Sequence, residues 1–81
     1  MRIKRNTQSI ERIYKEIGRN IKSDRIMSGL TQEQVAKKMK LARTTITNIE
    51  NGKQRIYLHT LYKIAKIIRA TPGVLLMKRL H

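Results

Sequence analysis

The chain lacks cysteine, tryptophan and phenylalanine, and it has only 1 proline and 4 glycines among its 81 residues. Without cysteine it forms neither a disulfide nor a cysteine-ligated metal site. Its 3 tyrosines are too few to supply the stacking surfaces by which proteins bind single-stranded nucleic acids. The scarcity of helix-breaking residues, with leucine, isoleucine and lysine abundant, predicts an all-α chain.

Acidic residues are also scarce, because 5 Asp and Glu stand against 19 Lys and Arg, for a formal net charge of +14. Such an excess attracts polyanions, which here means nucleic acids or anionic membrane surfaces. The carboxylates form no close catalytic pair, the serines lack a neighbouring base, and His59 and His81 are too far apart in sequence to suggest a metal site. We therefore expect neither an enzyme nor a cofactor.

A chain of 81 residues predicts one domain with a small core. No stretch approaches the roughly 20 apolar residues of a membrane-spanning helix, and no apolar block of the signal-peptide kind stands at the start. We expect a cytoplasmic protein with a basic flexible arm at residues 1–9 and one domain at residues 10–81.

Apolar residues recur at three- and four-residue steps in several segments, which predicts amphipathic helices. Gly29 suits the left-handed conformation that ends the first helix. Thr31 and Gln34 fit a capping box at the start of the second helix, and Thr71 before Pro72 caps the last. The predicted helices cover residues 10–28, 31–39, 43–51, 58–69 and 72–79.

Residues 30–53 are the most informative stretch, because they predict two short helices joined by a tight turn. That is the layout of a helix-turn-helix, which places its second helix in the major groove of DNA. The side of this helix opposite Ile46 and Ile49 is polar. An arginine there suits guanine, an asparagine suits adenine, and threonine methyls suit thymine methyls. The polar residues are Arg43, Thr44, Thr47 and Asn48.

An ordered set of motifs resembles the helix-turn-helix family of phage repressors and Cro-like regulators. The resemblance covers about residues 17–76, most of the chain. The motifs are Arg25, Gly29-Leu30-Thr31-Gln32, Val35-Ala36, Ile46, Ile49-Glu50-Asn51-Gly52-Lys53 and Leu61 with Lys63-Ile64-Ala65.

This resemblance implies a compact bundle of five helices, of the lambda-repressor-like type, that binds double-stranded operator DNA as a homodimer. It also implies a prokaryotic, phage or mobile-element protein on the nucleoid. It assigns base contacts to Arg43, Thr44, Thr47 and Asn48, phosphate contacts to Gln32, Asn51, Lys53 and Arg55, and an internal ion pair to Arg25 and Glu50.

Three positions depart from the family pattern. Lys40 stands where the turn usually has glycine, so a non-glycine residue must adopt a strained or altered turn. Ala42 replaces the usual Ser or Thr cap of the reading helix, which costs roughly 0.5–2 kcal/mol of local stability. Ile56 replaces the proline common before the fourth helix. These departures bear on the detailed geometry of the turn and leave the resemblance to the family intact.

The C-terminal region carries more large apolar side chains than a core of this size needs. Ile67 falls on the side of its helix opposite the core face and has no obvious place in the monomer. A twofold contact needs only one self-complementary patch. We therefore expect a dimer interface, with residues 10–14 as the next candidate surface. Its predicted residues are Ile67, Leu76, Met77 and Leu80.

The leading functional hypothesis is a sequence-specific regulator, and within that class a repressor. The alternatives of the same fold are an antitoxin that represses its own operon, with a toxin or anti-repressor as protein partner, and a restriction-modification controller. A cationic protein that folds on anionic lipid is a third class. The lysines outside the motif are interpreted as ordinary surface charges, namely Lys15, Lys22, Lys37 and Lys38.

Overall fold

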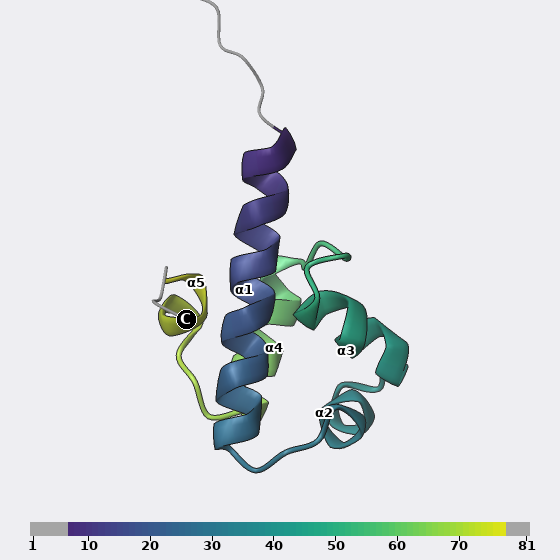
Figure 1. The fold of residues 1–81 in the computed structure, drawn as a ribbon. Helices are drawn as coiled ribbons and strands as arrows, with labels where there is room; N and C mark the ends of the chain where they lie inside the picture. Colours follow the sequence, from purple (N-terminus) through teal and green to yellow (C-terminus); the bar gives the residue numbers. More distant parts are fainter. Residues whose placement is uncertain (1–6, 78–81) are drawn as a thin grey trace, which may run out of the picture.

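The computed structural model describes residues 7–77, which form five helices and no strand (Figure 1). Amphipathic segments ended by turn residues become helices, as the sequence predicts, and the all-α fold is confirmed. None of the described helices is both long enough and apolar enough to cross a bilayer. The helices are α1 (Thr7–Met27), α2 (Gln32–Met39), α3 (Arg43–Glu50), α4 (Leu58–Ile67) and α5 (Pro72–Leu76).

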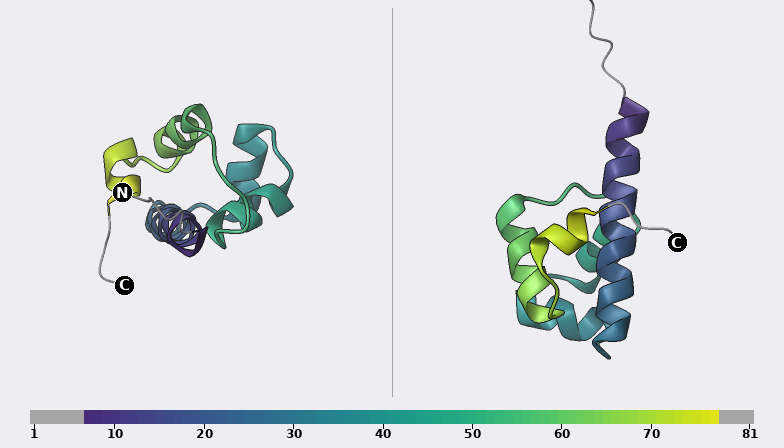
Figure 2. Two further views of the ribbon diagram at one scale, coloured as in Figure 1. Left: turned by 90° about the horizontal axis from the view of Figure 1, so that it is seen from above. Right: turned by 90° about the vertical axis from the view of Figure 1, so that its left-hand side faces the viewer.

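Helix α1 is the spine of the fold, with 21 residues against 5 to 10 in the others. Figure 2, seen from above, shows α2 and α3 on one side of α1, α5 on the other side, and α4 across from it. The N-terminal turns of α1 extend beyond the other helices (Figure 1). Gly18 permits the close approach of α3, because a Cβ there would stand only 2.5 Å from the backbone oxygen of Glu50.

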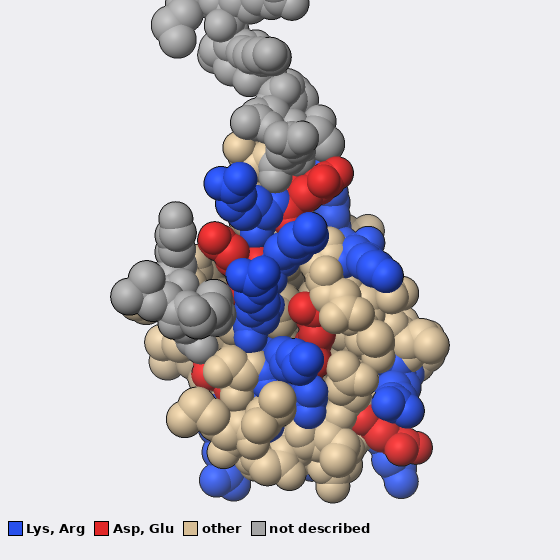
Figure 3. Space-filling model, viewed as in Figure 1, with Lys and Arg blue, Asp and Glu red and all other residues tan. Residues whose placement is uncertain are grey.

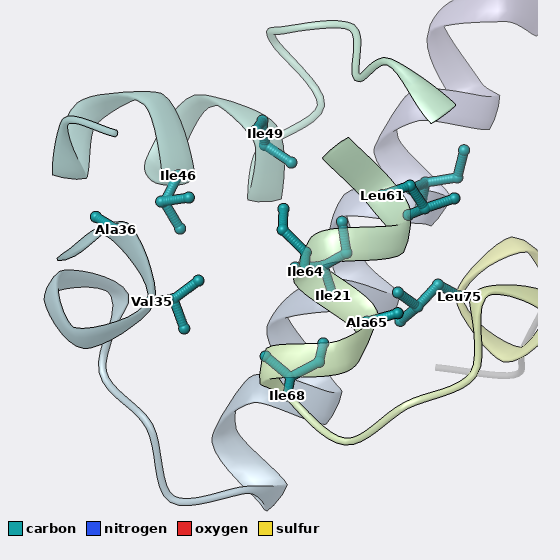
Figure 4. Close-up of a cluster of buried hydrophobic side chains, with 11 residues drawn as sticks. Ile21, Val35, Ala36, Ile46, Ile49, Leu61, Ile64, Ala65, Ile68 and Leu75 are labelled. Carbon is teal, nitrogen blue, oxygen red and sulfur yellow. The ribbon is translucent and has the colours of Figure 1, made fainter. Parts of the chain in front are cut away.

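The core lies where α1, α2, α3 and α4 meet, and α5 closes it (Figure 4). Ile46 of α3 and Ile64 of α4 are each 0% exposed, as is Leu75 of α5. Burial of one such side chain is worth about 1.5–3 kcal/mol, so the burial of Ile46 holds α3 against the bundle. The other buried apolar residues are Ile17, Ile21, Val35, Ala36, Ile49, Leu61, Ala65 and Ile68.

Caps and turns set the helix boundaries largely as predicted. The capping box of Thr31 and Gln34 is present in full, and Gly29 has a φ of 74°. Thr71 accepts a hydrogen bond from the backbone of Val74, and Pro72 follows it in the first turn of α5. Helix α2 therefore begins at the position that its capping box predicts.

Three boundaries differ from the predictions. Helix α1 begins at Thr7, so the predicted limit of the arm after residue 9 falls inside a helix, and residues 1–6 lie outside the described part. Helix α4 ends at Ile67, because Arg69 takes a left-handed φ of 59°. Helix α5 ends at Leu76, since Met77 is extended, rather than continuing toward residue 79.

Ile67 has a place in the monomer, which corrects the expectation that it has none. Its side chain is partly buried and packs against the core cluster. Its remaining surface is open, because Ile67 is half-buried rather than buried. Ile13 shows the opposite deviation, because it is an apolar residue of the amphipathic helix α1 and is nevertheless 53% exposed.

Asn20 is a buried polar residue that the sequence did not single out. It is 1% exposed, and its amide nitrogen donates to the backbone oxygens of Leu75 at 2.9 Å and Met77 at 2.7 Å. Those carbonyls end α5 and have no helical partner of their own. The side chain of Asn20 thus fastens α5 to α1.

Candidate nucleic-acid interface

Helix α3 presents one apolar and one polar side. Ile46 and Ile49 point into the core with 0% and 4% exposure (Figure 4). Residues 43, 44 and 48 are exposed, and Thr47 is half-buried between them and α2. Because residues three and four apart share a side of a helix, all four predicted base-contacting residues lie on the side away from the core. We call this side of α3, which the sequence predicts to contact bases, the reading surface; it is defined by Arg43, Thr44, Thr47 and Asn48.

A buried ion pair connects the end of α3 to α1. The Nε atom of Arg25 lies 2.6 Å from Oε2 of Glu50, and its Nη2 lies 3.1 Å from Oε1. The guanidinium also donates to the backbone oxygen of Leu30 at 2.8 Å. Arg25 is 8% exposed and Glu50 is 3% exposed, so both charges are removed from water and satisfy each other.

Hydrogen bonds through Gln32 connect the ion pair to the reading surface. The amide nitrogen of Gln32 donates to Oε1 of Glu50 at 3.0 Å, and the hydroxyl of Thr47 lies 2.9 Å from the amide oxygen of Gln32. An amide nitrogen carries two hydrogens, and only one is used by Glu50. Gln32 therefore positions α3 and retains a donor at the start of α2, where a phosphate would also meet the positive end of the helix dipole.

The hydroxyl of Thr47 is used inside the domain. Besides Gln32, it lies 3.2 Å from the backbone oxygen of Arg43, one turn earlier on α3. A hydroxyl has one hydrogen, which these two acceptors share or exchange. The sequence alone did not reveal this, because it depends on how α2 and α3 cross. The methyl group is thus the part of Thr47 that is not engaged in hydrogen bonding.

The turn between α2 and α3 carries two of the three departures from the family pattern. Lys40 adopts the left-handed conformation, with φ 58° and ψ 41°, as a glycine would. Ala42 has the extended geometry of an N-terminal cap, yet no side-chain hydrogen bond reaches the first turn of α3. The backbone thus keeps the geometry of a tight helix-turn-helix at a local cost in stability.

The basic loop after α3 packs against α1. Gly52 has a φ of 73°, and a Cβ on it would stand 2.6 Å from Cγ of Lys15. The guanidinium of Arg55 stands over the ring of Tyr14, 5.7 Å from its centre. Residues 51, 53 and 55 are all exposed, so they form an accessible polar loop beyond the C-terminal end of the reading surface.

Several large apolar side chains are exposed outside the reading surface, Met27 at the end of α1 most of all. At the end of α5, Leu76 and Met77 are 53% and 57% exposed, while Leu80 lies outside the described residues. At the start of α4, Tyr57 is 76% exposed and stacks on His59 with ring centres 5.6 Å apart. Over residues 7–77, no group of His, Asp or Glu side chains is arranged to bind a metal.

Known proteins share both the sequence pattern and the fold. The profile described as helix-turn-helix matches residues 21–75. An uncharacterized HTH-type transcriptional regulator of Archaeoglobus fulgidus is 42% identical over 50 residues, which are 62% of this chain and 71% of that protein.

Solved structures with similar folds include two regulators. The restriction-modification controller protein C.AhdI from Aeromonas hydrophila matches with a TM-score of 0.72 and 26% identity, over 76% of this chain and 94% of its own. The clp gene regulator ClgR from C. glutamicum matches with a TM-score of 0.78 over 82% of this chain and 85% of its own, and at 17% identity it supports the fold alone.

Proposed function

The chain belongs to the helix-turn-helix family of DNA-binding transcriptional regulators, and we propose that it is a repressor that binds a palindromic operator as a homodimer. Its place of action is the cytoplasm of a prokaryotic cell, and it carries out no catalysis. Repression follows from steric occlusion, because a protein bound across a promoter blocks the polymerase.

One observation carries this proposal: the polar side of α3 is exposed, while the opposite side of the helix is held by the core and by α1. Ile46 anchors α3 in the core, and Glu50 ties its last turn to α1. A helix held this firmly enters the major groove without reordering its own side chains or backbone, so less binding energy is lost to ordering.

The reading surface and its surroundings divide into two roles. Arg43 and Asn48 are exposed and of the right chemistry for bidentate contacts with guanine and adenine. Thr44 and the methyl group of Thr47 suit thymine methyls. The residues that would contact the phosphates of the DNA backbone are Gln32, Asn51, Lys53 and Arg55.

A homodimer supplies the length of site that one reading helix lacks. Two copies related by a twofold axis read two half-sites about 34–36 Å apart, one turn of DNA. The apolar residues proposed for this contact lie toward the C-terminal end, with Leu76 and Met77 the most exposed of those described. Ile67 contributes only the part of its surface that the core leaves open, and Leu80 completes the proposed set.

Selection of bound duplexes from a random DNA pool, followed by footprinting, tests this function. We expect one palindromic sequence to be enriched and a promoter carrying it to be silenced in a reporter strain. Binding should weaken steeply with salt, with a log–log slope of about −0.9 for each phosphate contacted by a cation. Recovery of unrelated sequences, or binding insensitive to salt, would exclude sequence-specific recognition of DNA.

A second candidate is the control of a restriction-modification system, which the likeness to C.AhdI at 26% identity favours over other roles of this fold. The same reading surface would then act on the promoter of a neighbouring pair of nuclease and methyltransferase genes. Gene neighbourhood distinguishes the two candidates, because a general repressor has no such genes beside it.

A further inference from the structure

One side of α1 carries basic side chains that neither the core nor the reading surface uses. They are spaced by three, four and three residues, and helix geometry places such positions in one row. All of them are exposed, and none forms an ion pair with a described carboxylate. Figure 3 shows Lys and Arg side chains gathered along α1. We call this row the α1 stripe; it consists of Arg12, Lys15, Arg19 and Lys22.

The α1 stripe runs beside the contact between α1 and α3. Lys15 and Lys22 stand three residues before and four residues after Gly18, the position where α3 comes closest. By helix geometry, Glu11 and Glu16 lie along the two edges of the stripe, so their negative charges flank the basic row and do not interrupt it.

The stripe is also continuous with the loop that follows the reading helix. Lys15 lies directly against Gly52, and the guanidinium of Arg55 stands over the ring of Tyr14, the residue of α1 just before Lys15. A shallow pocket spans this junction between the two elements. It is lined by Glu11, Tyr14, Lys15, Gly52, Lys53 and Arg55.

We propose that the α1 stripe binds the DNA backbone outside the base pairs that α3 reads. The inference rests on the proposed function, because it presumes that α3 occupies the major groove. From residue 12 to residue 22 the helix rises about 15 Å. One strand presents a charge every 3.4 Å of helix axis, so the row is long enough to meet several successive phosphates. The N-terminal turns of α1 thereby extend the contact surface past the globule (Figure 1).

The variant Arg12→Gln/Arg19→Gln in the full chain tests the stripe, because both side chains are exposed and support no described contact of the fold. The matched control is Lys63→Gln/Lys66→Gln, which removes two exposed charges from α4, across the bundle from α1 (Figure 2). Binding to the selected operator, flanked by additional duplex, is measured by fluorescence anisotropy over a salt series and by hydroxyl-radical footprinting.

We expect the stripe variant to lower the log–log salt slope by about 1.8, or about 0.9 for each lost phosphate contact. Over a fourfold rise in salt it would therefore lose about twelvefold less affinity than the unaltered protein. Its base preference should stay the same, its footprint should shorten at one edge of each half-site, and the α4 variant should match the unaltered protein.

An unchanged slope and footprint in the stripe variant would overturn the proposal, as would an equal effect of the α4 variant. If the stripe variant instead kept full operator binding and lost binding to phosphatidylserine vesicles, the partner would be a membrane, which also overturns it. Failure of the proposed function has a different signature, because the unaltered protein would then select no DNA sequence at all.

Discussion

Arg25 donates to Glu50 from two nitrogens, from Nε at 2.6 Å and from Nη2 at 3.1 Å, so that one forked ion pair joins α1 to the last residue of α3. Both partners are nearly excluded from water. Removing one therefore leaves the other as a buried charge without its main partner, which is far more costly than the net worth of the pair.

The first prediction is that Arg25→Met lowers the free energy of unfolding by about 3–5 kcal/mol. Urea denaturation followed by circular dichroism measures it. The double variant Arg25→Met/Glu50→Leu should recover much of the loss, because no charge is stranded. Glu33→Gln, which alters an exposed carboxylate of α2, should change stability by less than about 0.5 kcal/mol. An unchanged melting temperature for Arg25→Met would refute the structural role of the pair.

The second prediction concerns Lys40, which occupies a left-handed conformation with φ 58°. Glycine adopts this conformation without the Cβ clash, which is worth roughly 1–2 kcal/mol, but it loses more backbone entropy on folding. Lys40→Gly should therefore stabilise the protein by about 0.5–1 kcal/mol in urea denaturation. Lys37→Gly, inside α2, should destabilise it by about 1 kcal/mol. A loss of stability in Lys40→Gly would mean that the lysine side chain supports the turn.

The third prediction is that Ala42→Ser stabilises α3 by about 0.5–2 kcal/mol. Ala42 already has the extended backbone of a cap, with φ −70° and ψ 147°, and lacks only the side-chain oxygen. Thr31→Ala serves as the reverse control, because it deletes the cap that α2 possesses. In thermal denaturation, Ala42→Ser should have a higher melting temperature than the unaltered protein, and Thr31→Ala a lower one. Equal melting temperatures for Ala42→Ser and the unaltered protein would contradict the reasoning.

The main features of the fold follow from local signals in the sequence. Apolar spacing identified the core, and Gly29, Thr31 and Pro72 marked helix ends because each has a local backbone reason to stand there. Lys40 was expected to take an unusual conformation from its place in the turn alone, and it does so. Such signals act over a few residues, which is why they can be read without knowing the tertiary structure.

The remaining features depend on contacts between distant residues and were not predictable in this way. Asn20 is one polar residue among many on α1, and only the position of α5 makes it a buried donor. Ile67 appeared surplus because a helical projection of α4 does not show which side chains of other segments pack against its edge. Gln32 was assigned to a phosphate, whereas its bonds to Glu50 and Thr47 arise from the crossing of three helices.

The fourth prediction separates base readout from backbone contact. Asn48→Ala should lower the binding free energy for the operator by about 1–3 kcal/mol and relax the base preference at one base pair. The preference relaxes because, without the amide of Asn48, a wrong base no longer leaves that amide unpaired. Lys53→Gln should weaken binding to all sequences alike and reduce the salt slope by about 0.9. Binding measurements on the selected operator and its single-base variants distinguish the outcomes. If Asn48→Ala lost affinity uniformly, the residue would be a backbone anchor.

The fifth prediction is that Leu76→Lys produces a monomer that keeps its helices but binds the operator weakly. Leu76 is 53% exposed, so a lysine there meets water in the monomer and leaves the fold intact, whereas in a twofold contact it would bury a charge twice. The matched control is Tyr57→Lys, at a residue 76% exposed near the start of α4, which should dimerise normally. Sedimentation equilibrium measures the mass and circular dichroism the helix content. A Leu76→Lys protein that still dimerises would move the interface elsewhere, and Ile13 on the N-terminal part of α1 is then the next residue to alter, because its apolar side chain is 53% exposed.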